Sequence, residues 1–190
     1  MQKFEIYPNI PRRLIKLVIC AKQYACKWWD IKHLLSILAA YIYSRFHRKR
    51  IIYSALSIVI DSTSQVLLLS ISTIKKDLQN KDNPEIQALA LNAIGDVCTP
   101  DKCREISIEV ANIIQNAEES NMKKKAACAA VIIIKNCSEM MDSYVDKIPL
   151  LLEDRTHSVC LPGIYLVFKM ISKNKSIIDR IKKYHSMFII

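Results

Sequence analysis

Glycine is almost absent from this chain: only two occur among 190 residues, Gly95 and Gly163. At the average usage of about 7%, a chain of this length contains roughly thirteen. β-Hairpins, phosphate-binding loops and dinucleotide-binding folds need glycine at turns where the φ angle is positive. The composition, 51% apolar and 24% charged, also excludes a disordered chain. The sequence therefore predicts an all-α fold with a substantial core.

A sequence repeat organises most of the chain. Ser54, Ala90, Ala127 and Gly163 recur at spacings of 36, 37 and 36 residues, each inside an apolar segment. A small side chain at this place lets two helices approach closely, and each segment is followed, after a polar break, by a second apolar segment. Helix pairs with this period are typical of an α-solenoid of the HEAT or armadillo kind. We expect about four such pairs in residues 47–190, after basic amino-terminal helices in residues 1–46.

Capping residues and prolines agree with these divisions. Pro84 and Pro100 are predicted to occupy the first helical position, where the missing N–H costs no hydrogen bond. Pro162 falls within the first two turns of its predicted helix, whereas Pro149 is expected to kink its helix. Polar residues suited to helix starts are Asn83, Thr99, Ser120, Asp154 and Thr156.

The cysteines and histidines show no pattern of a catalytic or metal site. The seven cysteines have no regular spacing and no CxxC pair, so we expect reduced structural thiols in a cytosolic protein. The four histidines are scattered, and no nucleophile elbow, HExxH motif or phosphate-binding loop occurs. The sequence predicts that the chain is not an enzyme and has no cofactor and no metal.

Residues 51–74 could be mistaken for a membrane span, because this stretch of 24 residues holds a single charge, Asp61. However, the segment 61–65 is polar throughout and would lie at the bilayer centre. An aspartate alone costs about 2.5–3.5 kcal/mol there. The same residues suit a turn and a helix cap, so we expect two buried helices, with an integral membrane protein as the alternative.

The positive charge is concentrated at the amino end. Residues 1–50 hold eleven Lys or Arg and two acids, a net charge of +9, whereas the other 140 residues carry a net charge of +1. Such a surface attracts the phosphates of nucleic acid or of an anionic membrane, or serves only solubility. No nucleic-acid-binding motif accompanies the charge, so nucleic acid is not expected. The segment 123–125 places three lysines at a helix start, where cations oppose the helix dipole, which suggests an acidic partner or a lipid.

Residues 46–184 resemble the amino-terminal trunk of the large subunits of clathrin adaptor complexes, most of all the gamma adaptin type. Several elements of the trunk occur in order and at matching separations. They are KRI at 49–51, TIKKDL at 73–78 (similar to IKNDL), LALNAIG at 89–95 (similar to LALCTLG), KKKAACAAV at 123–131 (similar to RKKAALCAV), EMM at 139–141 (similar to ELM) and HSVCL at 157–161 (similar to HGVLL). The alpha type of the plasma-membrane adaptor is the nearest alternative, although it lacks the three basic residues that open segment 123–131.

The resemblance implies a non-enzymatic subunit in vesicle-mediated transport, located in the cytoplasm and peripherally on Golgi or endosomal membranes and coated vesicles. It implies a beta-type large subunit, a medium subunit and a small sigma-type subunit as partners, an Arf-family GTPase, and a phosphoinositide-containing membrane. A family large subunit has a longer trunk, a hinge and an ear domain, so clathrin binding by hinge and ear does not carry over. The alternative is a stand-alone basic HEAT-repeat protein that binds nucleic acid or transport cargo.

The resemblance also suggests site residues in the amino-terminal helices. Candidates for small-GTPase contacts are Leu35 and Leu38, which share one helix face, with burial in the core as the alternative. The candidates for binding phosphoinositide headgroups are Arg12, Arg13, Lys22, Tyr24, Lys27 and Lys32.

Overall fold

The computed structural model describes residues 49–50, 53, 65–97 and 99–182. These residues belong to two compact units, residues 1–73 and 74–190, and each unit is considered by itself. In the first unit the described residues are Lys49 and Arg50 in a helix, the buried Tyr53, and the first part of helix α4. All regular structure in the described ranges is helical, as the two-glycine composition predicts.

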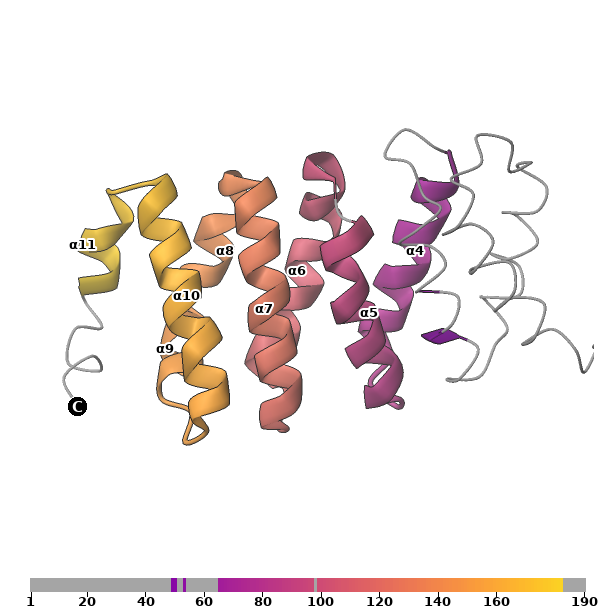
Figure 1. Cartoon of the computed structure of the whole chain (residues 1–190), viewed down its shortest axis with the longest axis horizontal. Helices are drawn as coiled ribbons and strands as arrows, with labels where there is room; N and C mark the ends of the chain where they lie inside the picture. Colours follow the sequence, from indigo (N-terminus) through magenta and orange to yellow (C-terminus); the bar gives the residue numbers. More distant parts are fainter. Residues whose placement is uncertain (1–48, 51–52, 54–64, 98, 183–190) are drawn as a thin grey trace, which may run out of the picture. The chain divides into compact units, whose positions relative to one another are not determined.

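The helices follow one another at short intervals (Figure 1). Helix α4 begins in the first unit and ends in the second. The bounds are α4 Gln65–Gln79, α5 Pro84–Val97, α6 Pro100–Asn116, α7 Ser120–Asn136, the 3-10 helix η1 Ser138–Met141, α8 Asp142–Val145, α9 Ile148–Leu152, α10 His157–Lys173 and α11 Ile177–Lys182. Among the helices the structure describes, none is long and apolar enough to cross a membrane.

Two layers of helices form the second unit (Figure 1). Helices α5, α7 and α10 lie side by side in one layer, and α7 packs on both of its neighbours. Behind them lie α6 and the short elements η1, α8 and α9, with α6 packed on α7 and α9 packed on α10. This arrangement of successive pairs confirms the predicted solenoid.

Small residues lie where helices of the second unit approach one another closely. Ala90 on α5 and Ala127 on α7 are fully buried, and Gly163 on α10 is buried as well. A Cβ atom built on Gly163 would lie 3.0 Å from the Cβ of Leu151, so glycine is needed where α10 crosses α9. The register of small residues found in the sequence therefore marks positions inside the core.

Large apolar side chains from both layers fill the space between them. The largest of the side chains that are essentially inaccessible in this unit include Ile74, Leu78, Leu91, Ile94, Ile106, Ile114, Ile133 and Tyr144. The Tyr144 hydroxyl donates a hydrogen bond to the carbonyl oxygen of Ser107 at 3.0 Å and accepts one from the Ser107 hydroxyl at 3.1 Å. A buried hydroxyl with partners avoids the free-energy penalty of an unsatisfied polar group.

The prediction that Pro149 kinks its helix was wrong, because no continuous helix runs through this proline. The segment after α7 is instead divided into η1, α8 and α9, and Pro149 lies in the first turn of α9. A proline in a first turn leaves no helical hydrogen bond unmade. Pro162 lies in the sixth position of α10, within its first two turns, as expected.

The helix starts agree with the prediction, but the threonine side chains at the N-caps form no capping hydrogen bond. Thr99 and Thr156 are the N-cap residues of α6 and α10, yet neither side chain caps its helix. Thr156 Oγ1 instead donates a hydrogen bond to Ser120 Oγ at 3.0 Å, which joins the starts of α10 and α7. Ser120 is the first residue of α7, and Glu119 precedes it as the N-cap.

Candidate interaction surface on α7 and α10

Helix α10 is apolar on two faces. The face toward the core carries Val159, Gly163, Leu166, Val167 and Met170, all buried. Four further apolar side chains on the same helix are exposed: Leu161 by 67%, Ile164 by 51%, Tyr165 by 50% and Phe168 by 60%. Their spacing of three, one and three residues places them along one side of the helix. We call these four residues the α10 stripe.

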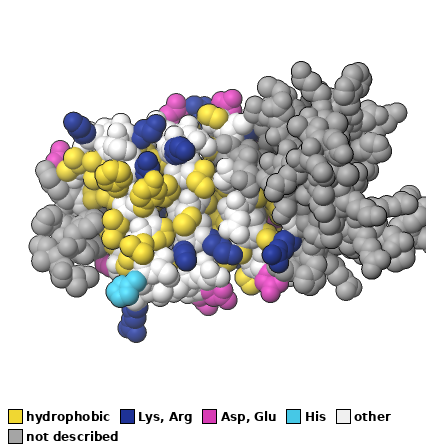
Figure 2. All heavy atoms as spheres, viewed as in Figure 1, with side chains coloured by type: hydrophobic (Ala, Val, Ile, Leu, Met, Phe, Trp, Pro, Cys, Tyr) yellow, Lys and Arg dark blue, Asp and Glu magenta, His cyan; other side chains and the backbone are white. Residues whose placement is uncertain are grey.

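Within the part of the chain that the structure describes, the α10 stripe does not contribute to the core. The core-facing residues already pack α10 on α7 and α9. Soluble proteins expose single apolar side chains routinely, but a contiguous apolar patch marks a site of interaction. Figure 2 shows apolar side chains gathered on this face of the second unit, with lysine and arginine side chains among them.

The surroundings of the stripe are positively charged. Helices α7 and α10 together contain six lysines and no aspartate or glutamate. The ammonium of Lys169 lies 5.3 Å from the centroid of the Tyr165 ring, a cation–π contact at the stripe itself. On α7, which packs beside α10, Lys124 and Lys135 are exposed. The face formed by α7 and α10 therefore combines apolar contact area with positive charge.

One of the three lysines at the start of α7 has its acidic partner inside the chain. The ammonium of Lys123 lies 3.1 Å from Asp154 Oδ2, and the Asp154 side chain is only 8% exposed. The Thr156 amide donates to Asp154 Oδ1 at 3.0 Å. This hydrogen bond, followed by the bond and charge of Lys123, lowers the pKa of Asp154. The external acidic partner suggested for segment 123–125 is thus not needed by Lys123, whereas Lys124 remains exposed.

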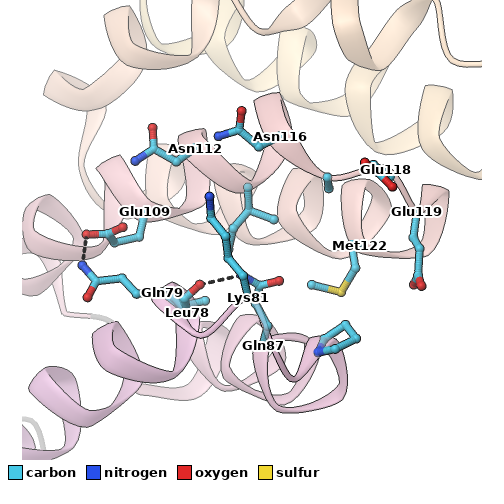
Figure 3. Close-up of a pocket in the computed structure, with 13 residues that line it drawn as sticks. Leu78, Gln79, Lys81, Gln87, Glu109, Asn112, Asn116, Glu118, Glu119 and Met122 are labelled. Atoms are coloured by element: carbon cyan, nitrogen blue, oxygen red, sulfur yellow. Dashed lines mark hydrogen bonds between the residues drawn. The ribbon is translucent and has the colours of Figure 1, made fainter.

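A polar groove of about 700 Å³ lies near the carboxyl end of α6 (Figure 3). Leu78 and Gln79 end α4 on one side, and Asn112 and Asn116 face the groove from α6. Gln79 Nε2 donates to Glu109 Oε1 at 2.7 Å, and Gln87 Nε2 donates to the Leu78 carbonyl at 2.6 Å. No thiol or imidazole lines this groove. The hydrogen bonds of Gln79 and Gln87 join neighbouring helices.

The thiols and titratable groups form no metal site in the described part of the chain. There, no group of three or more His, Cys, Asp or Glu side chains could hold a metal ion. Cys103 and Cys137 are buried thiols, Cys160 is partly buried and Cys128 is exposed. Cys160 Sγ donates weakly to the carbonyls of Leu152 and Asp154 at 3.3 Å, which is a structural contact.

The site residues suggested by the family resemblance lie outside the described residues. This applies to the proposed small-GTPase contacts Leu35 and Leu38. It applies equally to the proposed headgroup ligands Arg12, Arg13, Lys22, Tyr24, Lys27 and Lys32. Those assignments stay predictions.

The α10 stripe was missed in the sequence, although a signal for it is present. A surface helix normally shows one apolar face, whereas α10 has apolar residues at nearly every position between 159 and 171. Removing the buried positions 159, 163, 166, 167 and 170 leaves five large apolar residues, at 161, 164, 165, 168 and 171, of which the first four are exposed. Such an excess over one apolar face indicates a second buried face or an exposed contact surface.

Comparison with known proteins identifies the family of the chain. A model of the adaptin N terminal region matches residues 32–188. The chain is 31% identical over 134 residues to the AP-1 complex subunit gamma-1 of Arabidopsis thaliana, covering 70% of this chain and 15% of that protein. It is 31% identical over 135 residues to the AP-1 complex subunit gamma of Dictyostelium discoideum, covering 71% of this chain and 15% of that protein.

The subunit gamma-1 of Schizosaccharomyces pombe is 30% identical over 137 residues, covering 72% of this chain and 16% of that protein. The chain thus spans about one sixth of the length of these relatives. The matched region includes Leu35 and Leu38 and every helix of the second unit. The chain therefore belongs to the adaptin family, and residues 32–188 are an adaptin amino-terminal region of the gamma type.

Proposed function

We propose that the chain is a non-enzymatic subunit of a clathrin-associated adaptor complex, acting in vesicle-mediated protein transport at the Golgi or endosome. Membership in the adaptin family and the AP-1 gamma relatives support the type of complex. The observation that carries a binding role is the α10 stripe with its lysine-rich surroundings, because exposed apolar and charged side chains serve association.

The proposed partners are a beta-type large subunit, a medium subunit and a small sigma-type subunit. We further propose that the amino-terminal residues, with a net charge of +9 in positions 1–50, contact an Arf-family GTPase and an anionic, phosphoinositide-containing membrane from the cytoplasmic side. Several weak contacts to partner and membrane add through multivalency, so no single site needs high affinity.

Purification of the tagged full chain from its source cell tests the complex. The proposal expects that a beta-type large subunit and a sigma-type small subunit co-purify in stoichiometric amounts and are identified by mass spectrometry. A preparation of the folded chain that lacks both subunits would contradict it. Recovery of alpha-adaptor partners instead would replace the gamma assignment by the alpha assignment.

Vesicle co-sedimentation tests the membrane contact. Vesicles that contain a phosphoinositide should bind the chain, and binding should weaken as salt screens the lysines and arginines. Equal binding to neutral vesicles would contradict an electrostatic contact. The concentration of charge in residues 1–50 also favours a second candidate, nucleic acid binding, which filter binding to duplex DNA and RNA over a range of salt concentrations tests.

A further inference from the structure

We propose that the α10 stripe is the docking site for an acidic amphipathic helix of a partner protein. That the partner is a subunit or a ligand of an adaptor complex rests on the proposed function. The docking site itself rests on Leu161, Ile164, Tyr165 and Phe168 and on the charge around them.

The apolar part of the occupant follows from the stripe. Its four side chains are 50–67% exposed, and they run over two helical turns, a length of about 10 Å. Apolar residues at helical spacing on the partner would cover them side by side. A partner strand finds no sheet edge among the described residues of this unit, since all their regular structure is helical. The partner segment must therefore satisfy its own backbone hydrogen bonds, as a helix does.

The acidic part of the occupant follows from the charge of the surrounding helices. The six lysines of α7 and α10 are opposed by no aspartate or glutamate on either helix. Of these lysines, Lys123 is engaged by Asp154, while Lys124 and Lys135 are exposed. Lys169 lies over the Tyr165 ring with its ammonium next to the stripe. Carboxylates at the edges of a partner helix would complement these cations, which favours acidic over basic partners.

An anionic membrane is the competing occupant of the stripe. Lysines beside exposed apolar side chains also suit a surface of anionic lipid headgroups. An anionic vesicle is therefore included in the experiment as the competing occupant.

Fluorescence anisotropy with a designed probe tests the site. The probe is a labelled helical peptide of about 18 residues, with leucines on one face and glutamates elsewhere. The full chain should bind it, and the double variant Leu161→Ser with Phe168→Ser should bind at least about tenfold more weakly. A second probe with lysines in place of the glutamates should also bind at least about tenfold more weakly to the unmodified chain.

Ile108→Ser is the matched control variant. Ile108 is 61% exposed on α6, in the other layer, so its substitution removes a similar exposed apolar side chain outside the stripe. It should leave peptide binding unchanged, and far-ultraviolet circular dichroism should show that all variants keep their helical content. Equal binding of the glutamate probe by the double variant, or equal binding of both probes, overturns the proposal. A vesicle of about 70% phosphatidylcholine and 30% phosphatidylserine tests the membrane alternative. If the double variant loses vesicle binding but still binds the peptide, the stripe is a membrane contact instead.

The same double variant separates this inference from the proposed function. In the co-purification experiment, the variant should lose at least one partner that the unmodified chain recovers. If both forms recover the beta-type and sigma-type subunits equally, the docking site is wrong and the adaptor assignment stands. If neither form recovers them but the peptide binds as expected, the docking site stands and the adaptor assignment is wrong.

Discussion

Helices α6 and α10 are alike in length and lie in different layers, and they differ on their solvent side. Each has 17 residues, and each follows a threonine N-cap whose side chain makes no cap bond. The core-facing residues of both are predominantly apolar. Toward solvent, α6 presents Asp101, Arg104, Glu105, Ile108, Asn112 and Gln115. On its exposed side α10 presents the four apolar residues of its stripe.

The difference separates what folding requires from what it does not. The stack needs one apolar face per helix, and α6 meets this need with a polar outer face that carries the ion pairs Lys102–Glu105 and Arg104–Glu139. The second apolar face of α10 adds nothing to that packing and exposes apolar surface to water. A feature that folding does not require is the best place to look for binding.

The largest effect is expected on the buried faces, where the two helices should behave alike. Leu166→Ala on α10 and Ile114→Ala on α6 each remove a fully buried side chain. Each variant should lower the free energy of unfolding by about 2–5 kcal/mol, through lost burial and the cavity left behind. Urea denaturation followed by circular dichroism measures this. Leu161→Ala is the control on the exposed face. If it lowers the free energy of unfolding as much as Leu166→Ala does, the distinction between the two faces of α10 is wrong.

The close crossing of α10 over α9 should give the next largest effect. In Gly163→Ala the new Cβ lies 3.0 Å from the Cβ of Leu151, an atom close to the backbone that cannot rotate away. Overpacking outweighs the gain in helix propensity, so we expect a loss of about 1–2 kcal/mol.

Gly95→Ala on α5 is the matched control for this crossing. Its Cβ would lie 3.2 Å from Ile132 Cδ1, the far end of a flexible side chain. The substitution should be neutral or stabilise by up to about 1 kcal/mol. Thermal melting of both variants shows whether each substitution raises or lowers the stability. A stability gain in Gly163→Ala would show that the crossing of α10 and α9 can accommodate a methyl group.

The buried polar contact of α6 should give an effect similar to that of the α10–α9 crossing. Tyr144→Phe removes both hydrogen bonds to Ser107 and leaves the Ser107 groups without this partner in the core. We expect a loss of about 1–2 kcal/mol in the free energy of unfolding. Tyr165→Phe, which removes a hydroxyl from a half-exposed ring on α10, should change it by less than about 0.5 kcal/mol. Similar losses for Tyr144→Phe and Tyr165→Phe would mean that the hydrogen bonds between Tyr144 and Ser107 do not contribute to stability.

The smallest expected effect concerns the start of α10. The pKa of Asp154 in the folded chain is lowered from its ordinary value of 3.8. A lowered pKa stabilises the fold above the unfolded value, and this stability is lost as the pH falls through the folded value. Asp154→Asn should therefore cost about 1 kcal/mol at pH 7, and the difference from the unmodified chain should shrink below a pH of about 4.

Urea unfolding of both forms at neutral and acid pH measures the Asp154 effect. Glu153→Gln is the control, because Glu153 is the exposed carboxylate next in the chain. A difference between the unmodified chain and Asp154→Asn that stays constant with pH would rule out titration of Asp154 as its cause.

The sequence was sufficient for the repeat and the helix limits because both depend on local signals. Small residues at 90, 127 and 163 mark the core, and proline or polar residues mark the starts of α5, α6, α7 and α10. Contacts between distant residues could not be read in this way. The Lys123–Asp154 pair joins residues 31 apart, so the reason for a lysine at that helix start emerged only from the fold.

The division of the segment after α7 was not predictable from Pro149 alone. A proline inside an apolar run can kink a helix or start a new one, and the outcome depends on what the neighbouring layer accepts. Here Tyr144, Ile148 and Leu151 are each fully buried, and three short elements orient them where one straight helix would not. Tertiary packing overrode the local pattern.

The short elements η1, α8 and α9 also determine how this layer unfolds locally. Helices of four and five residues cannot persist through their own hydrogen bonds, so α8 and α9 depend on the burial of Tyr144, Ile148 and Leu151. Helix α6, with 17 residues, has internal hydrogen bonds along its whole length. Amide protons of residues 138–152 should therefore exchange with solvent through local openings that leave α6 and α7 closed. The split makes this segment the least cooperative part of the stack.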